Sequence, residues 1–261
     1  MVDALLYILA GAGVGFAIGV TGVGGGSLMT PLLLLFGFPL NVAIGTDLLY
    51  AAVTKAGGMA AHARRRNVDW RLVRRLALGS IPASLLTVYA LHTVFVAPDA
   101  YAPVLTSALG VMLIATAASI LLRDRLRGAD AASSGPLRKW ADDHADAVTT
   151  GIGLLLGICV TLSSVGAGAF GAAVLFALYP LLRAVRIVGT DIAHAVPLTF
   201  IAGLGHLALG NVDFLLLGAL LVGSLPAIWL GSRLADHLPE RIMRPVLATL
   251  LAGLGVRFAL F

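Results

Sequence analysis

Two stretches of this chain repeat one pattern. Residues 67–83 read NVDWRLVRRLALGSIPA, and residues 211–227 read NVDFLLLGALLVGSLPA. At the same spacing, Gly45-Thr46-Asp47 falls on Gly189-Thr190-Asp191. With a shift of two residues, the run TGVGGG at 21–26 falls on SSVGAG at 163–168. Several motifs in one register indicate an internal duplication, so we expect each half to form one structural unit.

The composition is that of a membrane protein. Of the 261 residues, 59% are hydrophobic and only 12% are charged, whereas a soluble domain carries about 25% charged residues. The mean hydropathy is +0.97. A soluble globule of this size cannot bury so much apolar surface. Because the arginines cluster between apolar stretches, the net charge of +5 fits membrane orientation and does not indicate a nucleic-acid partner.

The apolar segments predict an all-α polytopic fold, because a helix needs about 20 apolar residues to cross a bilayer. Each half supplies about five segments. The predicted segments are 4–20, 28–38, 42–62, 72–96 and 100–122, then 147–162, 169–182, 187–208, 213–232 and 242–260. We therefore expect a first membrane repeat over 1–122, a cytoplasmic linker over 123–146 and a second membrane repeat over 147–261.

The arginines predict opposite orientations for the two halves. The first Asn-Val-Asp loop is flanked by Arg64, Arg65, Arg66, Arg71, Arg74 and Arg75. The second loop, at 211–213, has no basic neighbour. The positive-inside rule then places the first loop in the cytoplasm and the second outside. Two inverted-topology repeats are the plan of many secondary transporters.

The two glycine-rich breaks are the predicted substrate site. Each lies at the turn of a broken, re-entrant hairpin, where the following helix begins with free N–H groups that favour an anion. Tight packing of small residues is the alternative explanation. The predicted substrate-binding residues are Thr21, Gly24, Gly25, Gly26, Ser27, Thr30, Thr46, Lys55, Ser163, Ser164, Gly166, Gly168 and Thr190.

Three ionisable residues inside the apolar segments are candidates for coupling or gating: Asp47, Asp191 and His194. Intramembrane carboxylates are costly and usually functional, although capping of a helix start is the alternative role. His194 lies one helical turn after Asp191, so the two can form a polar pair. Lys55 lies eight residues after Asp47, which is close to two helical turns on one face. It can pair with Asp47, attract the anion or extend to an interface. Because the second half lacks a matching lysine, Asp191 is expected to be the more readily protonated aspartate.

The sequence offers no sign of an enzyme. It contains a single cysteine, Cys159, which excludes an internal disulfide. We find no cluster of metal ligands, no nucleotide motif and no nucleophile motif, so neither a metal nor a cofactor is expected. Asp69 and Asp213 are expected to cap the helices that follow them.

Several of these motifs in combination resemble the TauE/SafE family of membrane transporters. The resemblance rests on the glycine-rich run that ends at Ser27, Pro31, Gly45-Thr46, the run Asn67 to Arg71, and Gly79. It covers nearly the whole chain and implies a permease, most often an exporter, for sulfite, organosulfonates and related anions. One difference is that Asp follows Gly-Thr in both halves, where the family often has Ser.

The sequence thus favours a secondary transporter of small sulfur-containing or organic anions in the bacterial inner membrane. A passive anion channel and, with less support, a membrane enzyme are the alternatives. The expected partners are the lipid bilayer, a small anion, protons and a second copy of the chain, and the sequence does not fix the oligomeric state.

Overall fold

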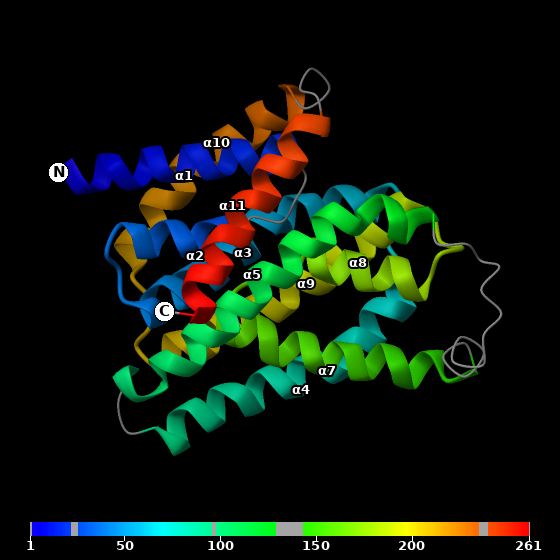
Figure 1. Cartoon of the computed structure of the whole chain (residues 1–261), viewed down its shortest axis with the longest axis horizontal. Coiled ribbons are helices and arrows are strands. Elements are labelled where there is room, and N and C mark those ends of the chain that lie inside the picture. The colour runs from blue at the N-terminus through cyan, green and yellow to red at the C-terminus, as the bar shows by residue number, and fades with distance from the viewer. Residues whose placement is uncertain (1, 22–25, 96–97, 129–142, 235–239, 261) are drawn as a thin grey trace.

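The fold is built from helices packed along one another (Figure 1). The structure is a computed structural model that describes all residues except 1, 22–25, 96–97, 129–142, 235–239 and 261. The first half contains α1 (Val2–Thr21), α2 (Gly26–Leu35), α3 (Leu40–Arg64), α4 (Trp70–Val94) and α5 (Pro98–Gly128). The second half contains α7 (Ala145–Ser163), α8 (Ala169–Leu178), α9 (Ala184–Ala208), α10 (Phe214–Leu234) and α11 (Glu240–Leu260). No strand occurs among the described residues, so the predicted all-helical class is confirmed.

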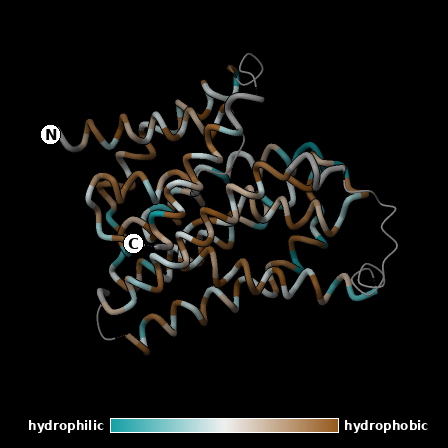
Figure 2. The backbone as a smooth tube through the Cα atoms, viewed as in Figure 1, coloured by the Kyte–Doolittle hydropathy of each residue, from teal (hydrophilic) through white to brown (hydrophobic). Residues whose placement is uncertain are grey.

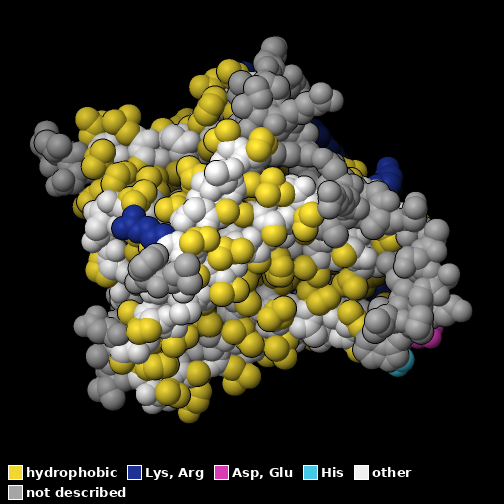
Figure 3. Space-filling view, in the orientation of Figure 1, with side chains coloured by type: hydrophobic (Ala, Val, Ile, Leu, Met, Phe, Trp, Pro, Cys, Tyr) yellow, Lys and Arg dark blue, Asp and Glu magenta, His cyan; other side chains and the backbone are white. Residues whose placement is uncertain are grey.

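Five of the described helices are long and apolar enough to cross a membrane: Trp70–Val94, Ala100–Leu122, Ala145–Ser163, Ala184–Ala208 and Phe214–Leu234. The colouring of the backbone by hydropathy shows hydrophobic residues along the helices (Figure 2), and many of them are exposed. On α4, Leu78 and Leu86 are 64% and 67% exposed, and on α10 Leu215 is 70% exposed. Hydrophobic side chains also spread over the visible face of the space-filling view (Figure 3). Exposed apolar surface of this extent is stable in lipid rather than in water.

Helices from opposite halves of the chain lie side by side. In Figure 1, α1 lies along α10 at the top of the view, and α4 lies along α7 at the bottom. Between these two pairs, α3 packs against α9, and α5 packs against α11. The first helix of each half therefore packs on the fourth helix of the other half.

Glycines permit two of these close approaches. A Cβ atom on Gly79 of α4 would lie 2.6 Å from the backbone nitrogen of Leu154 on α7. The matching Gly223 of α10 faces α1 in the same way, and a Cβ atom there would lie 2.9 Å from the nitrogen of Ala12. Contacts this short leave no room for a side chain. Small residues at helix crossings are typical of membrane proteins, where van der Waals packing drives helix association.

Both predicted helix caps are confirmed. Asp69 accepts hydrogen bonds from the backbone nitrogens of Arg71 (3.1 Å) and Leu72 (3.3 Å) at the start of α4. Asp213 accepts one from the nitrogen of Leu216 (2.9 Å) at the start of α10. These bonds satisfy N–H groups that have no partner within the helix.

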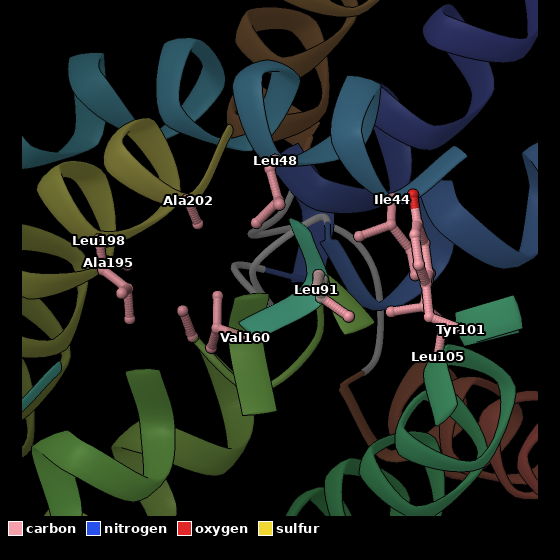
Figure 4. Close-up of a cluster of buried hydrophobic side chains, with 10 residues drawn as sticks. Ile44, Leu48, Leu91, Tyr101, Leu105, Val160, Ala195, Leu198 and Ala202 are labelled. Atoms are coloured by element: carbon pink, nitrogen blue, oxygen red, sulfur yellow. The ribbon is translucent and has the colours of Figure 1, made fainter. Parts of the chain in front are cut away.

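The centre of the molecule holds a buried apolar cluster to which five helices contribute (Figure 4). Its labelled members are Ile44 and Leu48 of α3, Leu91 of α4, Tyr101 and Leu105 of α5, Val160 of α7, and Ala195, Leu198 and Ala202 of α9. Ala167, which lies between α7 and α8, belongs to the same cluster. The break between these two helices is therefore anchored in the core.

Candidate functional site

The second glycine-rich break interrupts the helical backbone inside the protein. Helix α7 ends at Ser163, and α8 begins at Ala169. Between them, Ser164, Gly166 and Gly168 have φ angles of 57°, 116° and 142°. Positive φ values suit glycine and are uncommon for serine. With ten residues, α8 is about 15 Å long at 1.5 Å per residue, about half the thickness of the hydrocarbon core.

The serines at this break have different surroundings. Ser163 donates to the carbonyl oxygen of Cys159 (2.6 Å) and accepts from the nitrogen of Val165 (3.1 Å), so its hydroxyl stabilises the turn. Ser164 is 2% exposed, and its hydroxyl has no hydrogen-bond partner among the described residues. It faces the carboxylate of Asp47 on α3. Of the two predicted serines, Ser164 is the one available to a ligand.

The first break gives less information. Gly24 and Gly25 lie outside the described residues. Thr21 ends α1, and Gly26 and Ser27 begin α2, but their side chains also lie outside the described part of the chain. The roles predicted for these five residues therefore stay predictions. The first residue of this region whose side chain is described and polar is Thr30 of α2, and it is fully buried.

Asp47 contacts the second turn of α2. Its Oδ2 atom accepts a hydrogen bond from the Thr30 hydroxyl (2.5 Å) and another from the Thr30 backbone nitrogen (3.2 Å). Its Oδ1 atom is buried and has no partner among the described residues. Asp47 lies in the third turn of α3, which begins at Leu40. The alternative that it caps the start of its own helix is therefore wrong.

Asp191 holds the matching position in the second half. It lies in the third turn of α9, which begins at Ala184, so it does not cap its own helix either. A Cβ atom on Gly171 would collide with the Asp191 Oδ1 atom. Gly171 is in the first turn of α8, so this carboxylate approaches the positive end of a short helix.

Lys55 lies between the two aspartates. Its Nζ atom donates a 2.6 Å hydrogen bond to the carbonyl oxygen of Ala167 in the second break. Its electrostatic interaction with Asp191 is stronger than that with Asp47. Lys55 thus interacts with Asp47 on its own helix, as their spacing suggested, and also with Ala167 and Asp191 in the other half of the chain.

His194 completes a buried group of ionisable residues that we call the central charge cluster: Asp47, Lys55, Asp191 and His194. The His194 Nε2 atom hydrogen-bonds to the Ser80 hydroxyl on α4 (2.8 Å), and no described residue bonds to Nδ1. The structure thus joins His194 to Ser80 rather than to Asp191, the partner that its spacing suggested. None of the four side chains is more than 8% exposed.

Two further residues of this environment, Tyr50 and Ser224, were not expected from the sequence. Tyr50 is fully buried on α3 and faces Ser224 on α10, although the two hydroxyls form no hydrogen bond. The pair matches His194 and Ser80 position for position across the duplication. The repeated Gly-Ser-Leu/Ile-Pro-Ala motif contained the signal, because it places a serine in both halves.

Thr46 and Thr190 lie at helix junctions. The Thr46 hydroxyl accepts a hydrogen bond from the nitrogen of Asp213 (3.1 Å), and the Thr190 hydroxyl accepts one from the nitrogen of Asp69 (2.9 Å). Each threonine thus binds the start of a helix in the opposite half. These bonds connect the halves and explain why Gly-Thr recurs.

An apolar helical exterior, a break inside the core and a buried set of charges define a multi-pass membrane transporter. Lipid contacts its outer helices, because only a bilayer accommodates that surface. Comparison with known proteins gives the same class: the family described as sulfite exporter TauE/SafE matches residues 7–258. This chain belongs to that family.

Relatives along the full length support the class. The chain is 36% identical to the probable membrane transporter protein YjnA of Bacillus subtilis over 96% of this chain and 97% of that protein. It is 28% identical to the probable membrane transporter protein YdhB of the same organism, over 97% of this chain and all of that protein. A probable membrane transporter protein of Methanocaldococcus jannaschii is 26% identical over 96% of this chain. No solved structure matches.

Proposed function

We propose that this protein is a secondary transporter that exports small sulfur-containing or organic anions, such as sulfite or organosulfonates, across the bacterial inner membrane. It acts as a permease and not as an enzyme. The description of its family names sulfite export, and the full-length relatives are named as probable membrane transporters. The observation that carries the proposal is the central charge cluster, where Lys55 lies between two aspartates beside a broken helix.

The proposed architecture is a pair of inverted repeats, 1–122 and 147–261, joined by a cytoplasmic linker at 123–146. Reciprocal contacts support it. Thr46 binds the start of α10 and Thr190 binds the start of α4, while Gly79 and Gly223 admit the first helix of the opposite half. A twofold axis that exchanges the halves explains all four contacts. With the axis in the membrane plane, the two breaks meet near the midplane, where such transporters bind substrate.

The anion is proposed to bind where α2 and α8 begin. Unpaired N–H groups and the positive end of a helix dipole favour negative charge there. Lys55 adds a positive charge, and the Ser164 hydroxyl adds an unused donor. The carboxylate of Asp191 already approaches the start of α8, and that of Asp47 binds Thr30 in the second turn of α2. An arriving anion must therefore displace or neutralise at least one carboxylate.

Charge balance indicates how neutralisation occurs. Asp47, Asp191 and Lys55 together leave one negative charge when all three are ionised, and that charge repels an anion in a medium of low dielectric constant. One proton bound to the cluster removes the repulsion. The sequence favoured Asp191 as the protonated aspartate because the second half lacks a matching lysine, but the fold brings Lys55 to Asp191 as well. Lys55 interacts more strongly with Asp191, and Asp47 Oδ1 faces Ser164 and has no hydrogen-bond partner among the described residues. We therefore assign the proton to Asp47 instead, so that anion and proton cross together.

Flux into proteoliposomes tests the proposal. The purified protein is reconstituted, and the entry of radiolabelled sulfite, an organosulfonate and chloride is followed with and without an imposed pH gradient. We expect saturable sulfite or sulfonate flux that a gradient of matching direction accelerates, with empty liposomes as the control. Flux that ignores the pH gradient and does not saturate would identify a passive channel instead. Absence of flux for every anion would refute the proposal.

A further inference from the structure

The ammonium group of Lys55 lies against a backbone oxygen atom inside the protein. Its ammonium group lies 2.6 Å from the carbonyl oxygen of Ala167, which belongs to the unwound segment between α7 and α8. Its charged neighbours are the carboxylates of Asp191 and Asp47. The residue is 8% exposed, so water does not solvate this charge freely. The Ala167 carbonyl oxygen takes the place of a water molecule at the ammonium group, and the two carboxylates balance its charge.

Two further oxygens nearby are unsatisfied. Asp47 Oδ1 and Ser164 Oγ are buried and have no hydrogen-bond partner in the described part of the chain, and the two residues face each other. Helix α7 also ends at Ser163, so the negative end of its dipole points into the same region. Unwound carbonyls and half-helix C-terminal ends are the groups that coordinate Na⁺ in transporters built from broken helices.

We propose that the Lys55 ammonium is a built-in cation that takes the place of a coupling Na⁺ ion. This inference rests on the proposed transport function and adds to it a role for Lys55, which makes Na⁺ unnecessary for that function. Because the positive charge is covalently attached, it stays with the protein through the transport cycle. Transport by the natural protein is therefore independent of Na⁺, and shortening the side chain leaves an oxygen-lined position that accepts Na⁺.

The duplicated half supplies the most suitable substitution. Thr199 of α9 matches Lys55, and its hydroxyl donates to the carbonyl oxygen of Ala195 (2.9 Å) within its own helix. A threonine is thus compatible with this helical position. Lys55→Thr removes the ammonium and the long side chain, whereas Lys55→Met removes the charge but keeps most of the volume. The two variants separate loss of charge from opening of a site.

The experiment measures Na⁺ binding to purified protein in detergent, without substrate. Thermal unfolding of the natural protein, Lys55→Thr and Lys55→Met is recorded in NaCl and in choline chloride at equal ionic strength. We expect a saturable upward shift of Tm in NaCl for Lys55→Thr alone. The double variant Lys55→Thr/Asp191→Asn should lose this shift, because it lacks the carboxylate that interacts most strongly with Lys55. Binding of radioactive sodium should follow the same order.

Several results would overturn the proposal. These are a Lys55→Thr protein that folds but ignores Na⁺, an equal Na⁺ response in Lys55→Met, and a Na⁺ response in the natural protein. If Lys55→Thr does not fold in either salt, Lys55→Ser takes its place with the same criteria. Because these measurements need neither substrate nor flux, their failure is distinct from failure of the anion-transport proposal.

Discussion

At the scale of single residues, the two aspartates are not equivalent although their sequence contexts match. Asp47 is held by two hydrogen bonds from Thr30, and its other carboxylate oxygen has no hydrogen-bond partner among the described residues. Asp191 lies against Gly171, where the structure gives it no comparable hydroxyl donor, and it interacts more strongly with Lys55. Hydrogen bonds from Thr30 thus hold Asp47 in place, whereas the positive charge of Lys55 balances the charge of Asp191.

This difference predicts separate effects of the two Asn variants. Asp47→Asn should still support flux down an anion gradient but lose acceleration by a pH gradient, because the amide cannot take up the proton. Asp191→Asn should keep the pH response, bind the anion more tightly and turn over more slowly, because Lys55 loses its stronger counter-charge. Proteoliposome flux at several anion concentrations measures KM and rate for both. Full gradient dependence in Asp47→Asn would assign the proton to another group.

Thr30 is predicted to matter through its hydroxyl. Thr30→Val keeps the shape and the backbone N–H but removes the 2.5 Å bond to Asp47. Hydrogen bonds to charged groups contribute about 1.5–3 kcal/mol, and about 1.4 kcal/mol corresponds to a tenfold change in rate. We expect initial flux to fall at least about tenfold in Thr30→Val. Thr30→Ser, which keeps the hydroxyl, should retain most of the activity, and equal loss in both variants would contradict this role.

At the scale of helices, the crossing of α1 and α10 depends on one face of α10. Gly223→Ala places a methyl group against the backbone of α1, whereas Gly218 of the same helix has no neighbour within 4 Å. Overpacking costs typically 1–3 kcal/mol, so Gly223→Ala should lower the free energy of unfolding by about that amount. Gly218→Ala should be neutral or stabilising by up to about 1 kcal/mol. Denaturation in detergent, followed by circular dichroism, compares the two.

The same comparison tests the packing itself. If Gly218→Ala destabilises the protein as much as Gly223→Ala, the close approach of α10 to α1 is not the cause. Reduced stability of Gly223→Ala with unchanged flux per folded molecule would confine the effect of this crossing to packing.

At the scale of the whole molecule, the inverted topology predicts that the two Asn-Val-Asp loops lie on opposite sides of the membrane. Arg64 and Ala208 are exposed, precede these loops and match across the duplication. On a Cys159→Ala background, Arg64→Cys should react with a membrane-impermeant maleimide only in inside-out vesicles. Ala208→Cys should react only in intact cells or right-side-out vesicles. Labelling of both positions from one side would refute the inverted arrangement.

The sequence by itself determined the membrane class and the all-helical fold, because composition and apolar segment length are properties of the chain alone. The family followed from the combination of motifs. The sequence also placed a helix interruption at 163–168, where Gly166 and Gly168 adopt the positive φ angles that glycine allows. The caps at Asp69 and Asp213 followed from local spacing, since a cap bonds within three residues along the chain.

Only the tertiary structure decided the partner of each buried charge. Lys55 and Ala167 are 112 residues apart in the sequence, and the acceptor is a backbone carbonyl, which every residue has and no sequence motif marks. Helical periodicity suggested that Lys55 pairs with Asp47 and that His194 pairs with Asp191, because periodicity relates only residues of the same helix. Helices from opposite halves pack together here. Lys55 therefore interacts with Asp191 across the halves, and His194 hydrogen-bonds to Ser80 across the halves.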